Sequence, residues 1–200
     1  MSDHYYTSQP SVASNPMRWS FELRNQSFQF TSDRGVFSKK EVDFGSKLLI
    51  ETFQLTEVQG SLLDVGCGYG PIGLTLAKVY DERTVEMIDV NERAIALAKE
   101  NALINEVENV LIYKSDLFAN VENKSFAAIV SNPPIRAGKK VVHEILTEGY
   151  ERLAIGGELW IVIQKKQGAP SAIEKLETMF SDVEVVLKKK GYYIIKSKKG

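Results

Sequence analysis

The sequence predicts an α/β fold with a mainly parallel β-sheet. From residue 61 onward, short apolar runs alternate with segments that have an apolar face at helical spacing, which is the pattern of βαβ units. The final two apolar runs are joined only by a short basic turn, so these two strands should pair antiparallel. A chain of 200 residues can bury a large core without disulfide support, and its length predicts one domain with a small extension.

The segment ahead of this alternation is expected to form a small β element. Residues 1–17 contain two prolines and several Ser and Asn, which predicts an irregular arm. The runs 19–23 and 28–30 alternate apolar and polar residues, as strands with one buried face do. Asn25-Gln26 lies between them, so we expect an antiparallel strand pair.

The remaining elements are expected in regular order. We divide the chain into residues 1–42, the arm and strand pair packed on the core, and residues 43–200, the main domain. The expected helices are 43–53, 71–79, 91–103, 138–154 and 170–180. The expected strands are 62–65, 84–88, 110–113, 126–130, 158–163, 183–187 and 192–196.

Composition argues against several classes of protein. The single cysteine, Cys67, excludes a disulfide framework and a cysteine-based metal site. The two histidines, His4 and His143, are too few for a histidine-rich metal site, and we expect no bound metal. There is no apolar run near the roughly 18 residues of a membrane span, and no signal-peptide pattern. We therefore expect a cytoplasmic protein.

Charge is distributed unevenly along the chain. Residues 135–200 contain 13 Lys/Arg and 8 Asp/Glu, a balance of +5, whereas the preceding residues contain 12 and 18, a balance of −6; the sum is the net charge of −1. A basic C-terminal third could face a polyanion. It could equally be a solvated lysine surface, and the sequence leaves both interpretations open.

A glycine-rich turn follows the first strand of the main domain, with the sequence Asp64-Val65-Gly66-Cys67-Gly68-Tyr69-Gly70. Glycines there let the backbone turn sharply and approach a ligand closely. The register differs from a dinucleotide site, because counting from Gly66 places Pro71 at the third glycine position. A carboxylate at the mouth of the turn, Asp64, would attract a ligand with an ammonium or sulfonium group. S-adenosylmethionine carries both.

Two more acids follow the next two predicted strands. Asp89 ends the second strand, near the offset at which an acid accepts from two ribose hydroxyls. Asp116 follows the third and could accept from an adenine amino group. Any one of these acids could simply cap a helix or turn, but acids at three successive strand ends indicate a nucleoside site. Cys67 is interpreted as a small neighbour of the ligand, since no basic residue near it in sequence would make it a nucleophile.

The stretch Asn132-Pro133-Pro134 ends the strand at 126–130. Proline lacks an amide hydrogen and stops the sheet. The Asn132 side chain and the Pro133 carbonyl can then both accept hydrogen bonds at the edge where open α/β sheets bind ligands. Two close acceptors suit a substrate NH2 group. The alternative is a rigid loop that only ends a strand.

These motifs together resemble those of class I S-adenosylmethionine-dependent methyltransferases that methylate amino groups. The stretches 35–38, 43–46 and 133–139 resemble the small-subunit (16S) ribosomal RNA guanine-N2 methyltransferase family, of the compact single-domain type. The resemblance implies a Rossmann-like, seven-stranded, mostly parallel sheet with a reversed last strand, and it makes residues 43–200 the methyltransferase domain.

The resemblance also implies the cofactor, S-adenosylmethionine, and the roles of individual residues. Asn132 and Pro133 would be catalytic, each accepting one hydrogen of the guanine amine. The expected cofactor contacts are Phe37, Ser38, Asp64, Gly66, Cys67, Gly68, Gly70, Ile72, Asp89, Val90, Asp116, Leu117 and Asn132. The expected RNA contacts are Pro134, Ile135, Arg136, Lys139 and Lys140.

The expected partner is ribosomal RNA or the small ribosomal subunit, and a monomer is expected. Three alternatives stay open at this point: a protein glutamine-amide methyltransferase, an adenine-N6 methyltransferase, and a non-catalytic RNA-binding assembly module. The first two usually have an aromatic residue after the prolines, where this chain has Ile135. His143 is interpreted as structural or surface.

Overall fold

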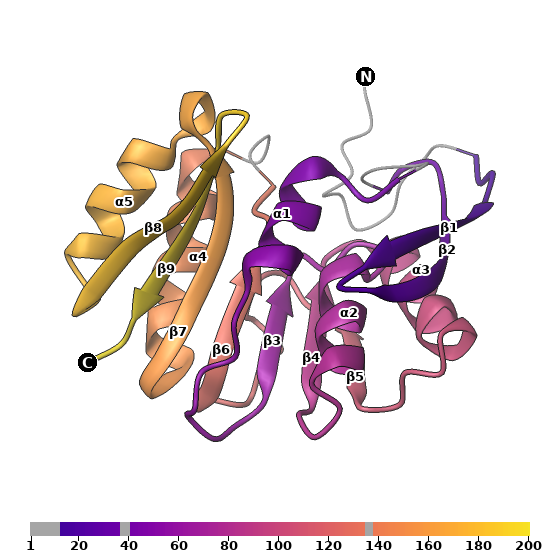
Figure 1. The fold of residues 1–200 in the computed structure, drawn as a ribbon, viewed down its shortest axis with the longest axis horizontal. Coiled ribbons are helices and arrows are strands. Elements are labelled where there is room, and N and C mark those ends of the chain that lie inside the picture. The colour runs from indigo at the N-terminus through magenta and orange to yellow at the C-terminus, as the bar shows by residue number, and fades with distance from the viewer. Residues whose placement is uncertain (1–12, 37–40, 135–137) are drawn as a thin grey trace.

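The computed structural model describes residues 13–36, 41–134 and 138–200. A seven-stranded sheet lies between two layers of helices, and a two-stranded sheet packs beside it (Figure 1). The strands are β1 (Met17–Leu23), β2 (Gln26–Ser32), β3 (Leu62–Val65), β4 (Val85–Asp89), β5 (Val110–Lys114), β6 (Phe126–Ser131), β7 (Leu153–Gln164), β8 (Asp182–Lys189) and β9 (Tyr192–Lys198). The helices are α1 (Phe44–Thr52), α2 (Pro71–Val79), α3 (Glu92–Ile104), α4 (Lys139–Arg152), the short η2 (Lys165–Gln167) and α5 (Ala169–Glu177).

The order of strands in the large sheet is β5-β4-β3-β6-β7-β9-β8. The five strands from β5 to β7 are parallel to one another, while β9 is antiparallel to both β7 and β8. This confirms the predicted sheet with its reversed last strand, and it shows that the last strand inserts between β7 and β8. Two apolar clusters cover the two faces of the sheet. One contains α1, α2 and α3, and the other contains α4 and α5.

The predicted N-terminal strand pair is present as β1 and β2. The turn between them has positive φ at Arg24 and Asn25, 49° and 59°, as a two-residue hairpin turn requires. Phe28 and Phe30 of β2 are fully buried in the same apolar cluster as α1, α2 and α3. The division of the chain at residue 42 stays a prediction.

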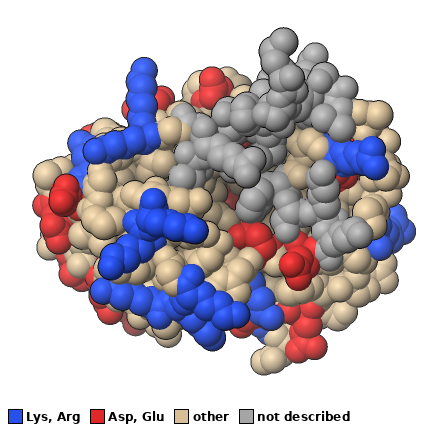
Figure 2. Space-filling model, turned by 90° about the horizontal axis from the view of Figure 1, so that it is seen from above, with Lys and Arg blue, Asp and Glu red and all other residues tan. Residues whose placement is uncertain are grey.

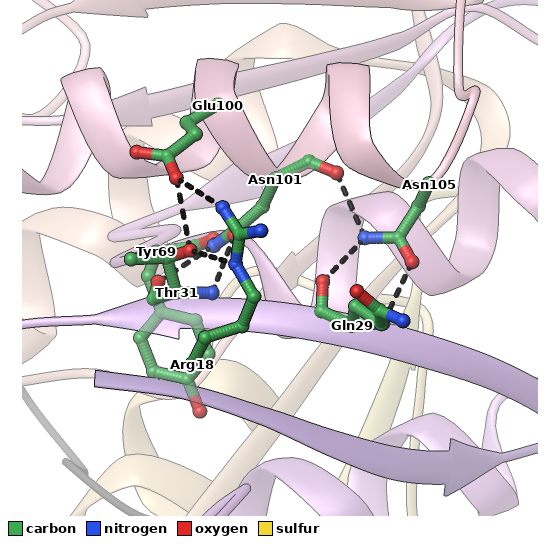
Figure 3. Close-up of polar contacts among 7 residues, drawn as sticks. All are labelled: Arg18, Gln29, Thr31, Tyr69, Glu100, Asn101 and Asn105. Carbon is green, nitrogen blue, oxygen red and sulfur yellow. Dashed lines mark hydrogen bonds and ion pairs between the residues drawn. The ribbon is translucent and has the colours of Figure 1, made fainter. Parts of the chain in front are cut away.

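Asn101 of α3 and Asn105, directly after that helix, hold the outer edge of β2 (Figure 3). Asn101 accepts from the Thr31 amide at 2.7 Å and donates to the Thr31 carbonyl at 2.9 Å, and Asn105 makes the same pair of bonds with Gln29 at 2.8 and 2.7 Å. The spacing permits this, because four helical residues rise about 6 Å and two strand residues about 6.7 Å. Asn101 also donates to the carbonyl of Tyr69, in the glycine-rich turn, at 2.8 Å. The small sheet is thus bonded to the turn after β3 through one side chain.

The boundary between α4 and β7 differs from the prediction. The helix ends at Arg152 rather than residue 154, and the strand begins at Leu153 rather than residue 158. Leu153 already pairs with Phe126, and a bulge follows before the ladder resumes. Gly157 lies inside this bulge, where a Cβ would come within 2.9 Å of two backbone oxygens. Gly157 thus permits the close approach of β6 and β7, and the strand begins before it. Helix α5 also ends early, at Glu177 rather than residue 180.

Candidate functional site

Strands β5, β4, β3 and β6 are adjacent and parallel, so their carboxyl ends form one edge. Asp89 ends β4, Asp116 follows β5, and Asn132 follows β6. The ends of β3 and β6 are joined directly, because Ser131 Oγ donates to the Val65 carbonyl at 2.8 Å. The sheet therefore brings the predicted cofactor acids and the Asn-Pro-Pro stretch to a single edge.

The turn after β3 leaves space above two of its glycines. Gly66 and Gly68 have φ of 76° and 58°, which other residues rarely adopt, and a Cβ on either would meet nothing within 4 Å. At Gly70, by contrast, a Cβ would lie 2.8 Å from Leu74. The first two glycines leave a cradle that a ligand can fill, and the third is needed for packing.

Asp89 holds this turn and retains spare acceptor capacity. Its Oδ2 accepts from the Gly68 amide at 2.9 Å, and its Oδ1 accepts from the Asn91 amide at 2.8 Å. Burial raises the pKa of Asp89 above its usual value, although these amide bonds act to lower it. The Val90 amide is a third donor to this carboxylate. A carboxylate can accept about four hydrogen bonds, so Asp89 still has room for a further donor such as a ribose hydroxyl.

Asp64 lies deeper than expected. We expected its carboxylate at the mouth of the turn, but that placement is wrong, because the side chain is fully buried and accepts from the Gly73 amide, in the first turn of α2, at 2.8 Å. Its Oδ1 is buried and accepts no bond from any described residue. Burial, with the charge of Asp89 as a smaller cause, raises the pKa of Asp64 to about 7. An orphaned buried carboxylate oxygen fits a ligand that carries positive charge.

The other predicted cofactor contacts surround this cradle in the fold. Cys67 is buried, and burial first, then the charges of Asp89 and Asp64, raises the pKa of its thiol well above the usual value. A thiol that stays protonated is a poor nucleophile, in agreement with the interpretation of Cys67 as a small neighbour. Ile72 is buried in the first turn of α2, and Val90 is half-buried after β4.

The loop after β5 is held in an uncommon conformation. Leu117 has a positive φ of 46°. Ser115 secures it, because its Oγ donates to the Leu117 carbonyl at 2.6 Å and accepts from the Asn120 amide at 3.0 Å. Asp116 is exposed within this loop. Its carboxylate is therefore accessible to an amino group.

Asn132 is fixed by two residues of the α1 N-terminus. Its Nδ2 lies 3.3 Å from both carboxylate oxygens of Asp43 and 3.0 Å from Ser46 Oγ. An ionised carboxylate can only accept, so the amide nitrogen must face Asp43 and the amide oxygen must face away. Among the residues that the structure describes, none donates to Asn132 Oδ1 or to the Pro133 carbonyl. Within the described ranges, these two acceptors at the end of β6 therefore have no donor.

The prediction of site residues did not include Asp43 and Ser46. The sequence does carry a signal for Asp43, an acid directly before a helix, and it caps α1 by accepting from the amides of Gly45 and Ser46. That signal predicts a cap and does not reveal the contact with Asn132, which lies 89 residues further along the chain.

The remaining predicted site residues are only partly described. Phe37, Ser38, Ile135 and Arg136 lie outside the described residues. Pro134 is half-buried, and Lys139 and Lys140 are exposed at the start of α4.

His143 of α4 contacts the neighbouring helix α5. Its ring contacts Ser171 of α5 at 3.3 Å, and burial, then Lys139 and Lys175, lower its pKa. In the described ranges, no three His, Cys, Asp or Glu side chains are grouped to hold a metal ion, and no helix is long and apolar enough to cross a membrane.

Comparisons with known proteins agree with this arrangement. Residues 27–196 match a family model described as "Methyltransferase small domain". The chain is 66% identical over the full length of both chains to "Uncharacterized protein YbxB" of Bacillus subtilis strain 168. It is 31% identical to "Ribosomal RNA small subunit methyltransferase C" of Actinobacillus pleuropneumoniae serotype 3, across 82% of this chain and 50% of that protein. The chain therefore spans about half the length of such methyltransferase C relatives.

A solved structure is similar over nearly the whole chain. It is titled "T. Thermophilus 16S rRNA N2 G1207 methyltransferase (RsmC) in complex with AdoMet and Guanosine", and it superposes with a TM-score of 0.80 at 26% sequence identity. The match covers 96% of this chain and 52% of that one.

Proposed function

Because the chain belongs to the methyltransferase small domain family and its cofactor is S-adenosylmethionine, we propose that it methylates the exocyclic amine, N2, of a guanine in small-subunit ribosomal RNA. The observation that carries this proposal is the fixed amide of Asn132. Among the described residues, none donates to its oxygen or to the Pro133 carbonyl, at the strand end next to the glycine cradle. The printed names of the methyltransferase C relatives and of the T. thermophilus structure support the choice of guanine N2.

The amine of guanine needs help to react, because its lone pair is delocalised into the ring. Asn132 Oδ1 and the Pro133 carbonyl would each accept one amine hydrogen, which favours a pyramidal nitrogen with its lone pair directed toward the cofactor. Asp43 would keep the Asn132 oxygen facing the substrate. When bound, S-adenosylmethionine supplies an electrophilic methyl group on a sulfonium. The residues of the chain would then contribute positioning and electrostatic stabilisation, and methyl transfer would need no strong base.

The residues that would hold the cofactor divide by chemistry. Gly66 and Gly68 would give it room, and Asp89 would accept from the ribose hydroxyls. Asp64 would lie below the cationic end, and Asp116 would accept from the adenine amine. With this substrate the protein would act in the cytoplasm on ribosomal RNA or the small ribosomal subunit.

The test is methyl transfer from labelled S-adenosylmethionine to small ribosomal subunits, to naked small-subunit RNA and to a peptide-chain release factor. The RNA is then digested to nucleosides and the labelled nucleoside is identified. We expect label in N2-methylguanosine. Label confined to N6-methyladenosine or to a protein glutamine would contradict the proposal, as would cofactor binding without transfer to any of the three substrates.

A further inference from the structure

Seven exposed lysines gather at the carboxyl end of the sheet, on the half formed by β7, β9 and β8. They come from the start of α4, from η2 directly after β7, and from the end of β8 and the turn that follows it. We call them the lysine rim: Lys139, Lys140, Lys165, Lys166, Lys188, Lys189 and Lys190. Within the described part of the chain, none of them forms an ion pair with an acid.

Parts of the rim that are distant in sequence lie next to each other in the fold. The Lys165 amide donates to the Gly191 carbonyl at 2.8 Å, and Gln164 pairs with Tyr192 in the ladder. The lysines of η2 therefore lie beside those of the β8–β9 turn. Figure 2 looks down on this end of the molecule and shows Lys and Arg side chains most densely on its left and lower left, with Asp and Glu at its left margin, its top, near its centre and at its bottom. Most of the Lys and Arg side chains seen on this face thus lie to one side of the edge that carries the site.

An aromatic pair lies between this rim and Asn132. The rings of Phe44 and Tyr192 are 5.4 Å apart, and both residues are half-buried. Lys190 Nζ lies 5.0 Å from the centre of the Phe44 ring, which connects the pair to the rim. On its other side Phe44 directly follows Asp43, which bonds Asn132. The order across the surface is therefore amide acceptor, aromatic pair, lysines.

We propose that the single-stranded RNA next to the target nucleotide runs from Asn132 across Phe44 and Tyr192 to the lysine rim. This proposal rests on the proposed function. Unpaired bases stack on aromatic side chains, and lysines neutralise the phosphates between them. A base must also leave its duplex to reach an acceptor pair at a sheet edge, so unpaired RNA is the form that this surface would meet. An acidic protein partner would use the lysines but would not require the aromatic pair.

The test compares two triple variants that change the net charge equally. The rim variant is Lys165→Glu, Lys166→Glu and Lys189→Glu. The control variant is Lys99→Glu, Lys124→Glu and Lys198→Glu, three exposed lysines outside the rim. The probe is a fluorescein-labelled single-stranded RNA of about 16 nucleotides, and anisotropy is measured over a series of salt concentrations. Cofactor binding by calorimetry verifies that each variant is folded.

We expect the rim variant to bind the RNA at least about tenfold more weakly at low salt, with the slope of log affinity against log salt reduced by about two. The control should stay within about twofold of the wild type. Equal weakening by both triples, or no effect of the rim variant, overturns the proposal. Tighter binding of a duplex of the same sequence also overturns it.

A second variant tests the aromatic pair. Phe44→Leu keeps an apolar side chain but removes the ring, and it should weaken RNA binding about fivefold or more without changing the salt slope. Unchanged affinity contradicts the aromatic part of the path.

These binding measurements are independent of methyl transfer. If the rim variant methylates guanine as well as the wild type does, the proposed RNA path is wrong and the proposed function stands. If RNA binding depends on the rim but guanine is not methylated, the RNA path stands and the proposed function is wrong.

Discussion

The ends of β3 and β6 lie side by side but are built in different ways. After β3, backbone groups hold the chain: the amides of Gly66 and Cys67 both donate to the Ile88 carbonyl at 2.9 Å, and the Gly68 amide donates to Asp89. After β6, a single side chain, Asn132, is held by two other side chains, from the N-cap and the first turn of α1. The proposed cofactor side is thus a backbone cradle, whereas the proposed target side is an oriented amide.

The difference separates the two kinds of damage that a substitution can do. A cradle made of backbone tolerates changes of neighbouring side chains but fails when a Cβ enters its space. An oriented amide fails when its supporting carboxylate is lost, although the cofactor can still bind. The charge near the two strand ends also differs, because acids lie at the cradle, whereas the lysine rim lies beyond the Asn132 amide. A cationic cofactor and an anionic substrate would each meet the opposite charge.

The largest expected effect is a loss of stability on replacing Asn101, which bonds the glycine-rich turn to β2. Asn101→Ala leaves the amide and carbonyl of Thr31 and the carbonyl of Tyr69 without their partner in a buried place. We expect a loss of about 3 kcal/mol in the free energy of unfolding, measured by urea denaturation. Asn123→Ala, in a surface loop, is the control and should cost less than about 1 kcal/mol. Equal costs would contradict the anchoring role of Asn101.

The cradle itself is tested by a pair of glycines. Gly68→Ala places a methyl group in the open space and should lower cofactor affinity about 100-fold, while its positive φ costs about 1–2 kcal/mol of stability. Gly73→Ala points a methyl group at Met87, 2.7 Å away, so it should cost about 1–3 kcal/mol of stability and change cofactor affinity only a few-fold. Calorimetry and urea denaturation separate the two. Equal losses of affinity would contradict the assignment of the cradle.

On the target side, Asp43 can be removed without losing the helix cap. Asp43→Ser keeps a capping residue before α1 but takes the carboxylate away from Asn132. We expect the rate of methyl transfer to fall about 30-fold, because the amide can then rotate, with cofactor affinity unchanged. Single-turnover transfer measures the rate. An unchanged rate would show that Asn132 does not depend on Asp43.

The smallest expected effect is a pH dependence of cofactor binding. With a pKa of about 7, Asp64 is mostly protonated near pH 5.5 and mostly ionised near pH 7.5. A cationic ligand favours the ionised form, so affinity should rise several-fold as pH increases across this window, with a proton released on binding. Calorimetry in buffers of different ionisation enthalpy measures both. Asp64→Asn should remove the dependence; if it persists in that variant, another group is responsible.

Most of the fold could be predicted from the sequence because its signals are local. The strand 62–65 and the helix 71–79 match the structure residue for residue, since Pro71 and the glycine turn mark the change between them. The start of β7 was missed because Leu153 joins the sheet through a bulge that depends on pairing with Phe126. Such pairing is a property of the folded chain and leaves no local pattern.

The features of the candidate site also differ in how far the sequence could predict them. Its acids and glycines lie at strand ends that a sequence pattern can locate. The depth of Asp64 could not be predicted, because it depends on the position of the Gly73 amide in α2. The contact between Asp43 and Asn132 could not be predicted either, because it brings two loops together across the sheet edge.

The most direct test of the account is the pair Asn132→Ala and Asn123→Ala, compared in cofactor binding and in single-turnover methyl transfer to small-subunit ribosomal RNA. We predict that Asn132→Ala lowers the transfer rate at least about 100-fold while cofactor affinity changes only a few-fold. Asn123→Ala should match the wild type in both. Full transfer by Asn132→Ala, with guanine still the methylated base, would contradict the role of the oriented amide.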